Sequence, residues 1–225
     1  MTPLPRAAVL TGDLIGSAKA DPAAVKTAFD ALTAASAQIA AWIGADTRLT
    51  RFRGDGWQIV MSESPELALR AAVFLIASLR AVKGGLATRV AIGIGPTDSL
   101  GTQNLSDAAG PAFTLSGRAL DRGRFQALAI DFDGITPLHL GYNDLIEAVI
   151  RRWTPEQAQA ITFSIPPDHP LTQEAIGQTL GISPQAVSYR LSGASDFALR
   201  QALRHWEGAM EFRPDKAALF RKDRQ

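Results

Sequence analysis

Two acidic residues, Asp13 and Asp55, occupy places in the sequence where carboxylates can bind a divalent cation. Asp13 ends a short apolar run that begins at Arg6, and Asp55 lies between two glycines. Two unpaired carboxylates a few ångströms apart repel each other, and a bound Mg²⁺ or Mn²⁺ relieves that repulsion because hard cations prefer oxygen ligands. A fold that brings these two residues together would therefore form a metal site.

The backbone that follows Asp13 is a candidate for binding phosphate. Its N–H groups lie ahead of a predicted helix, and helix starts bind phosphate oxygens; the residues concerned are Leu14, Ile15, Gly16 and Ser17. A metal site beside a phosphate cradle is the usual arrangement for chemistry on nucleoside triphosphates. Each piece also has a purely structural explanation, because an aspartate often caps a helix and Gly-Asp-Gly often forms a turn.

A third segment, 107–118, places Asp107 in a loop before a short helix that carries Thr114 and Arg118. We expect Arg118 to lie on the exposed side of this helix. A guanidinium group can bind phosphate oxygens with paired hydrogen bonds. The alternative interpretation is an ordinary solvated charge, paired with Asp121 or Asp107.

The elements that must position these residues alternate between strand and helix. Strand patterns cover 6–14, the two arms of a hairpin within 49–61, 87–95 and 125–132, and helix patterns cover 22–43, 64–83 and 111–122. The order predicts an α+β fold, a ferredoxin-like or palm sheet with helices packed on one face. In such a sheet the hairpin lies beside the first strand, so we expect Asp13 and Asp55 to face each other at one edge.

The composition excludes several classes of protein. The 225 residues include 23 Lys and Arg against 22 Asp and Glu, which rules out a strongly basic, histone-like chain. The absence of cysteine excludes disulfides, a thiol nucleophile and thiolate metal sites. No apolar run is long enough to span a membrane and the start is unlike a secretory signal, so we expect a cytoplasmic protein.

The strand pattern stops near residue 137, and the remainder is helical. We therefore divide the chain into a palm domain over 1–137, a helical linker over 138–168 and a helix-turn-helix domain over 169–225. Gly177 supplies the small residue where two such helices cross, Gly181 the turn, and Val187 the inward apolar contact. Ser183 caps the second helix and Pro184 takes its first position.

The second helix of this motif would leave four side chains to meet the major groove of duplex DNA, namely Gln185, Ser188, Tyr189 and Arg190. Since one subunit offers few phosphate contacts, we expect a homodimer. The alternative is a helical hairpin used only for packing or dimerisation.

Taken in order, the three acidic and basic segments resemble the catalytic core of the class III nucleotide cyclases. In that family two aspartates bind the metal ions, here Asp13 and Asp55, and an arginine on a helix stabilises the transition state, here Arg118. The resemblance assigns Asp107 to the base and Thr114 to a position where the family has an asparagine that orients the ribose. Leu49 stands where a base-reading lysine is expected.

The segments LTGDLIGSAKA, FRGDGWQ and DAAGPAFTLSGRAL, together with the helical tail, resemble the SatD family. That resemblance implies a DNA-binding regulator with a cyclase-like domain that dimerises and offers a site for Mg²⁺ and a nucleotide. The alternative is an active cyclase that converts a nucleoside triphosphate with two Mg²⁺ ions on Asp13 and Asp55. A third hypothesis is a structural or partner-binding protein in which both motifs have lost their function. Of the three we favour the DNA-binding regulator, with the cyclase second.

Overall fold

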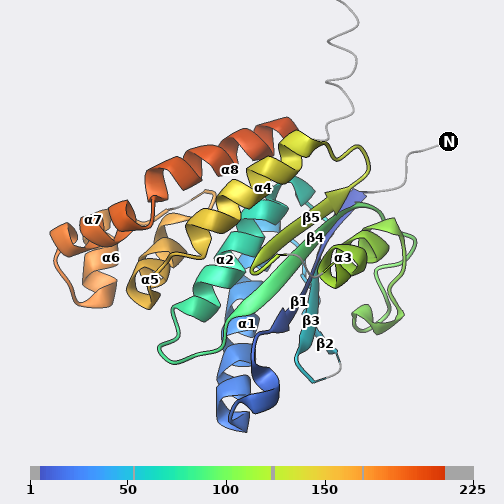
Figure 1. Cartoon of the computed structure of the whole chain (residues 1–225), viewed down its shortest axis with the longest axis horizontal. Helices are drawn as coiled ribbons and strands as arrows, with labels where there is room; N and C mark the ends of the chain where they lie inside the picture. Colours follow the sequence, from blue (N-terminus) through green and yellow to red (C-terminus); the bar gives the residue numbers. More distant parts are fainter. Residues whose placement is uncertain (1–5, 53, 123–124, 169, 211–225) are drawn as a thin grey trace, which may run out of the picture.

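Five strands form one sheet in a computed structural model that describes residues 6–52, 54–122, 125–168 and 170–210. The order is β2-β3-β1-β4-β5 (Figure 1). The strands are β1 (Arg6–Leu14), β2 (Thr50–Phe52), β3 (Gly56–Met61), β4 (Thr88–Pro96) and β5 (Leu128–Phe132). β1 is antiparallel to both β3 and β4, and β5 is parallel to β4. The mixed α+β sheet expected from the sequence is thus present, and the outer ends of the predicted domains, residues 1–5 and 211–225, lie outside the described residues.

Two long helices, α1 (Pro22–Ile43) and α2 (Ala68–Arg80), cover one face of the sheet. The Asp21 carboxylate caps α1 by accepting a hydrogen bond of 2.7 Å from the Ala23 amide, and Gly44 ends the helix in the left-handed conformation. α2 is buried on nearly every side, which explains its almost continuous apolar sequence. A short 3₁₀ turn, η2 (Pro65–Leu67), precedes it.

The third helix of the palm, α3 (Pro111–Asp121), lies against the opposite face of the sheet. The expectation that all helices pack on one face is therefore wrong. The reason is that β1 is apolar on both sides: Leu10 faces α1 and α2, whereas Val9 packs with Ala112 of α3. Gly93 allows the close approach, because a Cβ there would lie 2.3 Å from the Ala112 carbonyl oxygen.

Up to residue 210 the structure describes five further helices, of which α4 and α8 run beside the sheet and α2 (Figure 1). They are α4 (Pro137–Ile150), α5 (Pro155–Ser164), α6 (Gln173–Leu180), α7 (Pro184–Gly193) and α8 (Asp196–Met210). Their buried side chains, such as Ile161 and Leu203, belong to the same apolar cluster as the sheet. Within the described ranges, none of the helices combines the length and apolar character that crossing a membrane requires.

A buried ion pair fastens α8 to the palm. The Arg70 guanidinium of α2 donates hydrogen bonds of 2.6 and 2.9 Å to the two carboxylate oxygens of Glu207, and one of 2.8 Å to the Ile165 carbonyl oxygen. The Arg70 side chain is only 4% exposed. Since a charge buried this deeply needs full pairing, these contacts fix the position of α8.

Candidate functional site

The structure brings Asp13 and Asp55 to one end of the sheet. Asp13 in β1 is paired in register with Gly56 of β3, so Asp55 lies at the adjacent position of the hairpin. The Leu14 amide donates a hydrogen bond of 3.3 Å to the Asp55 carbonyl oxygen. Both aspartates line one hollow of about 350 Å³. The neighbourhood predicted from the palm topology is therefore present.

Asp13 is engaged by a guanidinium group. Arg89, its register partner in β4, donates a hydrogen bond of 2.9 Å from Nε to Oδ1 and a second from Nη2 to Oδ2. The hydrogen bond that Arg89 donates to Asp13 raises the pKa of Arg89. The expectation of two unpaired carboxylates is therefore wrong, because the charge of Asp13 is already neutralised within the sheet.

Asp55 has a neutral partner. The Ser17 hydroxyl donates a hydrogen bond to its Oδ2. Asp55 also lines a second hollow of about 340 Å³, together with Arg51, whose guanidinium lies 4.1 Å from the centre of the Phe29 ring. In the part of the chain that the structure describes, no ion pair joins Asp55 to a cationic side chain.

The donor set does not fit the pair of metal ions that the sequence predicts. Among the described residues, no group of three or more His, Cys, Asp or Glu side chains is placed to hold a metal ion. Asp13 gives both carboxylate oxygens to Arg89. Asp55 alone is suited to contact a cation that arrives with a ligand, since Mg²⁺ commonly binds one carboxylate together with substrate phosphates.

Some of the backbone amides predicted to bind phosphate already donate hydrogen bonds within the chain. The Leu14 amide donates to Asp55, and the Ile15 amide donates to the Ala87 carbonyl oxygen at 2.8 Å. Gly16 takes a left-handed conformation, and only a three-residue 3₁₀ turn, η1 (Ser17–Lys19), follows. Two of the four predicted N–H donors are therefore used to hold the loop against the sheet, and the α-helix itself begins further on, at Pro22.

Thr114 and Arg118 lie on the exposed side of α3 and line a different hollow, of about 900 Å³. The structure does not bring them to Asp13 and Asp55 within one chain. Asp107, in the turn η3 (Leu105–Asp107), is occupied with its own loop: it accepts hydrogen bonds from the Thr102 hydroxyl at 2.8 Å and from the Thr102 amide at 3.1 Å. These contacts lower the pKa of Asp107.

The α6 and α7 helices meet at a short turn. Gly181 ends α6 in the left-handed conformation, and the Ser183 hydroxyl caps α7 by accepting a hydrogen bond of 3.1 Å from the Ala186 amide. A Cβ on Gly177 would lie 2.8 Å from the Ile182 carbonyl oxygen, so the crossing has no room for a larger residue. The buried Val187 holds α7 against α6.

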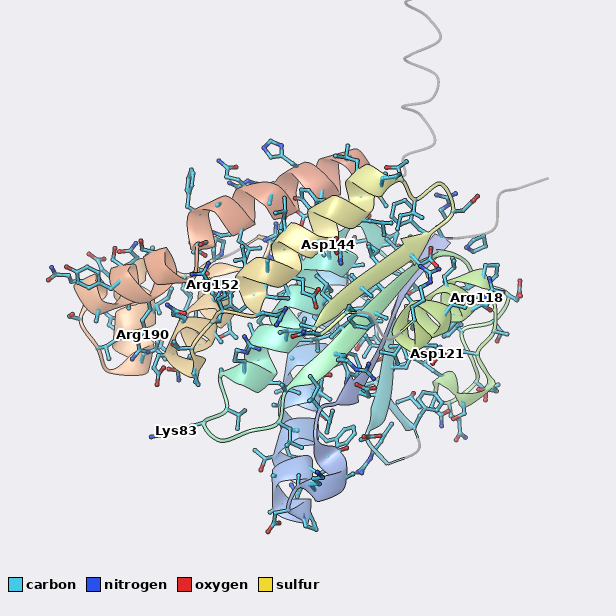
Figure 2. All side chains as sticks on the ribbon, in the orientation of Figure 1. Lys83, Arg118, Asp121, Asp144, Arg152 and Arg190 are labelled. Atoms are coloured by element: carbon cyan, nitrogen blue, oxygen red, sulfur yellow. The ribbon has the colours of Figure 1, made fainter. Side chains whose placement is uncertain are left out.

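The four residues predicted to contact DNA differ in exposure. Gln185 is exposed, and so is Tyr189, whose exposed fraction is 71%. Ser188 and Arg190 are half-buried, and Arg190 donates a hydrogen bond of 3.3 Å to the Gln159 side chain in α5. Figure 2 shows Arg190 at the end of the molecule formed by α5, α6 and α7.

Comparison with known proteins gives matches to solved structures, and none to family models or curated sequences. Among solved structures, the catalytic core of a rhodopsin-guanylyl cyclase in complex with ATPalphaS is 18% identical, with a TM-score of 0.41 over 54% of this chain and 76% of that one. The guanylyl cyclase Cya2 is 20% identical, with a TM-score of 0.40 over 54% and 73%. A bacterial light-regulated adenylyl cyclase is 19% identical, with a TM-score of 0.39 over 56% and 76%.

At identities of 18–20% and TM-scores of 0.39–0.41, these matches carry no argument about the site, which has to be argued from its own residues. The matched structures are described as nucleotide cyclases, and their TM-scores are all below 0.5, so the likeness of this chain to a cyclase palm stays a prediction. Membership of the SatD family stays a prediction, because no family model matches.

Sequence reasoning missed Arg89, which forms hydrogen bonds with both carboxylate oxygens of Asp13. A signal was available, since Arg89 is the only charged residue in the strand Thr88–Pro96. It also missed the apolar walls of the Asp13 and Asp55 hollow, to which Phe52 and Phe113 contribute from β2 and α3. Those walls come from segments far apart in the sequence, so spacing along the chain does not reveal them.

Proposed function

We propose that the palm binds a nucleoside triphosphate in a site shared by two copies of the chain. One copy would contribute the hollow of Asp13 and Asp55, and its partner would contribute Thr114 and Arg118 of α3. The observation that carries this proposal is the division of the motif residues between two separate hollows on one palm. A homodimer that places the α3 hollow over the Asp55 hollow would reunite them.

The chemistry of the first hollow supports this proposal. Its walls are largely apolar, with Phe52, Leu105 and Phe113 around the two carboxylates, and a volume of about 350 Å³ is of a size to take a nucleobase and its sugar. Arg51 and Ser17 line the neighbouring hollow on the other side of Asp55. Cationic and hydroxyl groups of this kind bind phosphate oxygens. The solved cyclases with a similar fold include one bound to ATPalphaS.

Mixing two defective variants tests the shared site. Asp55→Asn and Arg118→Ala should each lose binding of ATP or GTP, measured by calorimetry in the presence of Mg²⁺. A mixture of the two variants should regain binding, because each mixed dimer contains one intact site. Lys83→Gln is a control, since Lys83 lies away from both hollows (Figure 2). Loss of binding in the mixture as well would overturn the shared arrangement.

Cyclisation of the bound nucleotide is the further step that the sequence resemblance implies. Asp13 and Asp55 are near enough to line one hollow, which favours this activity. The ion pair between Arg89 and Asp13 opposes it, because turnover with two Mg²⁺ ions needs both carboxylates free. Incubation with each nucleoside triphosphate and Mg²⁺ or Mn²⁺, followed by chromatography of the products, tests it directly. Product that persists in Asp55→Asn would identify a contaminant.

Duplex DNA binding by α6 and α7 is a second function that we propose, supported by the close crossing at Gly177 and the exposed face of α7. Gln185 can bind base edges, and Tyr189 can contact the sugar-phosphate backbone. Arg190, on the same helix, brings one positive charge to this part of the surface.

A pair of equally exposed aromatic residues makes the DNA test specific. Tyr189 on α7 and Phe197 on α8 are both 71% exposed. After selection of a duplex from a random library, fluorescence anisotropy should show that Tyr189→Ala binds about tenfold more weakly. Phe197→Ala should bind as the unmodified protein does. Equal affinities for the two variants, or no duplex bound more tightly than random DNA, would remove this proposal.

A further inference from the structure

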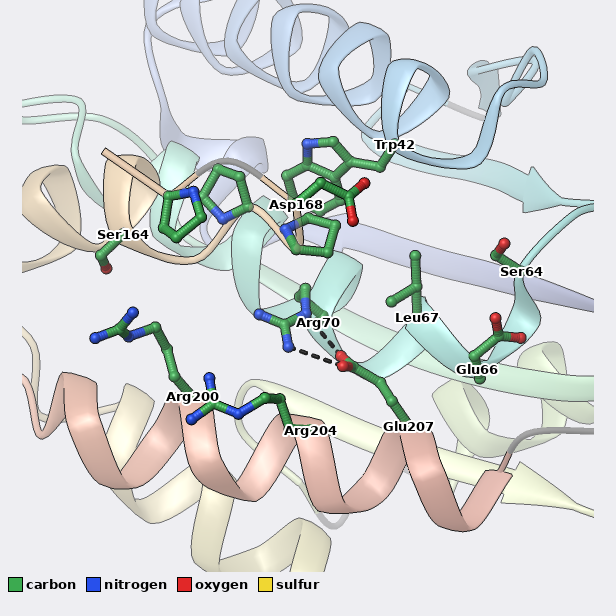
Figure 3. A pocket seen from close by; sticks show the side chains of 13 residues that line it. Trp42, Ser64, Glu66, Leu67, Arg70, Ser164, Asp168, Arg200, Arg204 and Glu207 are labelled. Atoms are coloured by element: carbon green, nitrogen blue, oxygen red, sulfur yellow. Dashed lines mark hydrogen bonds and ion pairs between the residues drawn. The ribbon is translucent and has the colours of Figure 1, made fainter. Parts of the chain in front are cut away.

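A further cavity, remote from Asp13 and Asp55, lies between the palm and the C-terminal helices. Its volume is about 440 Å³, within the range of small-molecule sites. Figure 3 shows that three parts of the chain enclose it: the end of α1 with the η2 turn, the proline-rich segment after α5, and α8. None of the motif residues identified from the sequence lines it.

The walls of this cavity are fixed by buried polar contacts. The pair of Arg70 and Glu207 joins the floor of the cavity to α8, and both residues line it. On the other side, the Ser164 hydroxyl donates a hydrogen bond of 2.6 Å to Asp196, which also accepts one of 3.1 Å from Arg200. A cavity whose lining side chains are held in this way is pre-formed, so a ligand has little ordering to impose.

Two cationic side chains of α8 line one wall of the cavity. Arg200 and Arg204 lie one turn apart on α8 and both line it. The Arg200 charge is shared with Asp196, whereas Arg204 donates only to the neutral side chain of Gln201, at 2.5 Å, among the contacts of the described residues. Arg204 is thus a cation without an acidic partner there.

The opposite wall carries acidic and aromatic groups. Glu66 and Asp168 line the cavity together with the half-buried indole ring of Trp42. In Figure 3 the Trp42 and Asp168 side chains lie on the side of the cavity away from α8. The Trp42 ring is held by Phe74, with 4.7 Å between the ring centres. A ligand that fits both walls has an anionic end and a planar end that donates hydrogen bonds.

We propose that this cavity binds a purine nucleoside monophosphate. The phosphate would accept hydrogen bonds from Arg204 and Arg200, since guanidinium groups match phosphate oxygens. The purine would pack against Trp42 and donate from its amino group to Asp168 or Glu66. The proposal does not depend on nucleotide binding at Asp55, because the two sites share no lining residue. The ligand would contact the palm and α8 at once.

Calorimetric titration with GMP, AMP and inorganic phosphate tests this site. One or both nucleotides should bind and should change the tryptophan fluorescence, and Trp42→Phe should abolish that change. Arg204→Gln should weaken nucleotide binding at least tenfold, and this exposed residue can be replaced without disturbing the core. Arg152→Gln is the matched control, since Arg152 is exposed on a different part of the surface (Figure 2).

Three results would overturn the proposal: no nucleotide binding at millimolar concentration, equal affinity in Arg204→Gln, or inorganic phosphate that binds as tightly as GMP and AMP. Asp55→Asn separates this site from the palm site. Nucleotide monophosphate binding that survives Asp55→Asn but not Arg204→Gln supports the cavity, whatever becomes of triphosphate binding. Binding lost in Asp55→Asn and kept in Arg204→Gln assigns the ligand to the palm and overturns the proposal.

Discussion

The Arg89 guanidinium is bound to the Asp13 carboxylate through two hydrogen bonds that join the neighbouring strands β4 and β1. A positive charge supplied by the chain itself therefore lies where the sequence motif predicts a metal ion. Both side chains are partly exposed, 30% for Arg89 and 26% for Asp13, so the pair is accessible to competing ions.

Arg89→Leu should create the cation site that Arg89 now prevents. Without the guanidinium, Asp13 and Asp55 form a pair of acids in one hollow, and a divalent cation relieves their repulsion. We expect Mn²⁺ to bind at least tenfold more tightly to Arg89→Leu than to the unmodified protein, as measured by electron paramagnetic resonance. The double variant with Asp13→Asn should lose that gain. Tight Mn²⁺ binding to the unmodified protein, sensitive to Asp13→Asn, would contradict the role given to Arg89.

Replacing one member of the Arg70–Glu207 pair should destabilise the protein strongly, whereas replacing both together should cost much less stability. Glu207→Gln leaves the guanidinium, with 4% exposure, without its counter-charge, and we expect a loss of about 3 kcal/mol in the free energy of unfolding. Arg70→Met combined with Glu207→Leu should recover much of it, because apolar side chains can fill the same space. Urea denaturation of the single and double variants measures the coupling. Additive losses would show that the pair is not energetically linked.

Gly177→Ala should destabilise the junction of α6 and α7. The added methyl group would lie 2.8 Å from the Ile182 carbonyl oxygen, which is backbone and cannot move away cheaply. Overpacking of this kind costs about 1–3 kcal/mol. Gly208→Ala in α8 is the control, since nothing lies within 4 Å of its Cβ position. That variant should be neutral or gain up to about 1 kcal/mol from helix propensity. Thermal denaturation compares the two, and equal melting temperatures would contradict the tight crossing.

The loop before α3 should respond to acid. The Thr102 hydroxyl and then its amide stabilise the charged form of Asp107, so the folded pKa lies below the ordinary value of 3.8. The contribution of these contacts is present above pH 3.8 and is lost as the pH falls through the folded pKa. Nuclear magnetic resonance titration of the Asp107 carboxyl group should show this low pKa. Thr102→Val should move it upward, and an unchanged value would show that the hydroxyl has no part.

The sequence predicts most of the fold because the local signals are strong. Asp21 with Pro22 marks the start of α1, and Gly54-Asp55-Gly56 marks the hairpin, and both appear where they are expected. The position of α3 was predicted wrongly. Strand β1 is apolar at successive residues, which indicates that both faces of the sheet are covered, and the prediction of helices on one face did not use that signal.

The candidate site could be predicted only as far as its backbone neighbourhood. Topology brings Asp13 next to the hairpin that carries Asp55, and topology follows from the order of the elements. What a side chain contacts depends on residues that approach from elsewhere. Arg89 meets Asp13 across 76 positions of sequence, and Arg70 meets Glu207 across 137. Single charges inside apolar segments are the signal that such partners exist, but they do not identify the partner.

Because α2 is buried on nearly every side, this protein is poorly suited to truncation experiments. One side of this helix faces the sheet and another faces α5 and α8, so removing the C-terminal third would expose a broad apolar stripe to water. A shortened chain would aggregate or unfold, and its inactivity would say nothing about which half carries which role. Point substitutions, not deletions, are the proper tools for separating the activities of this molecule.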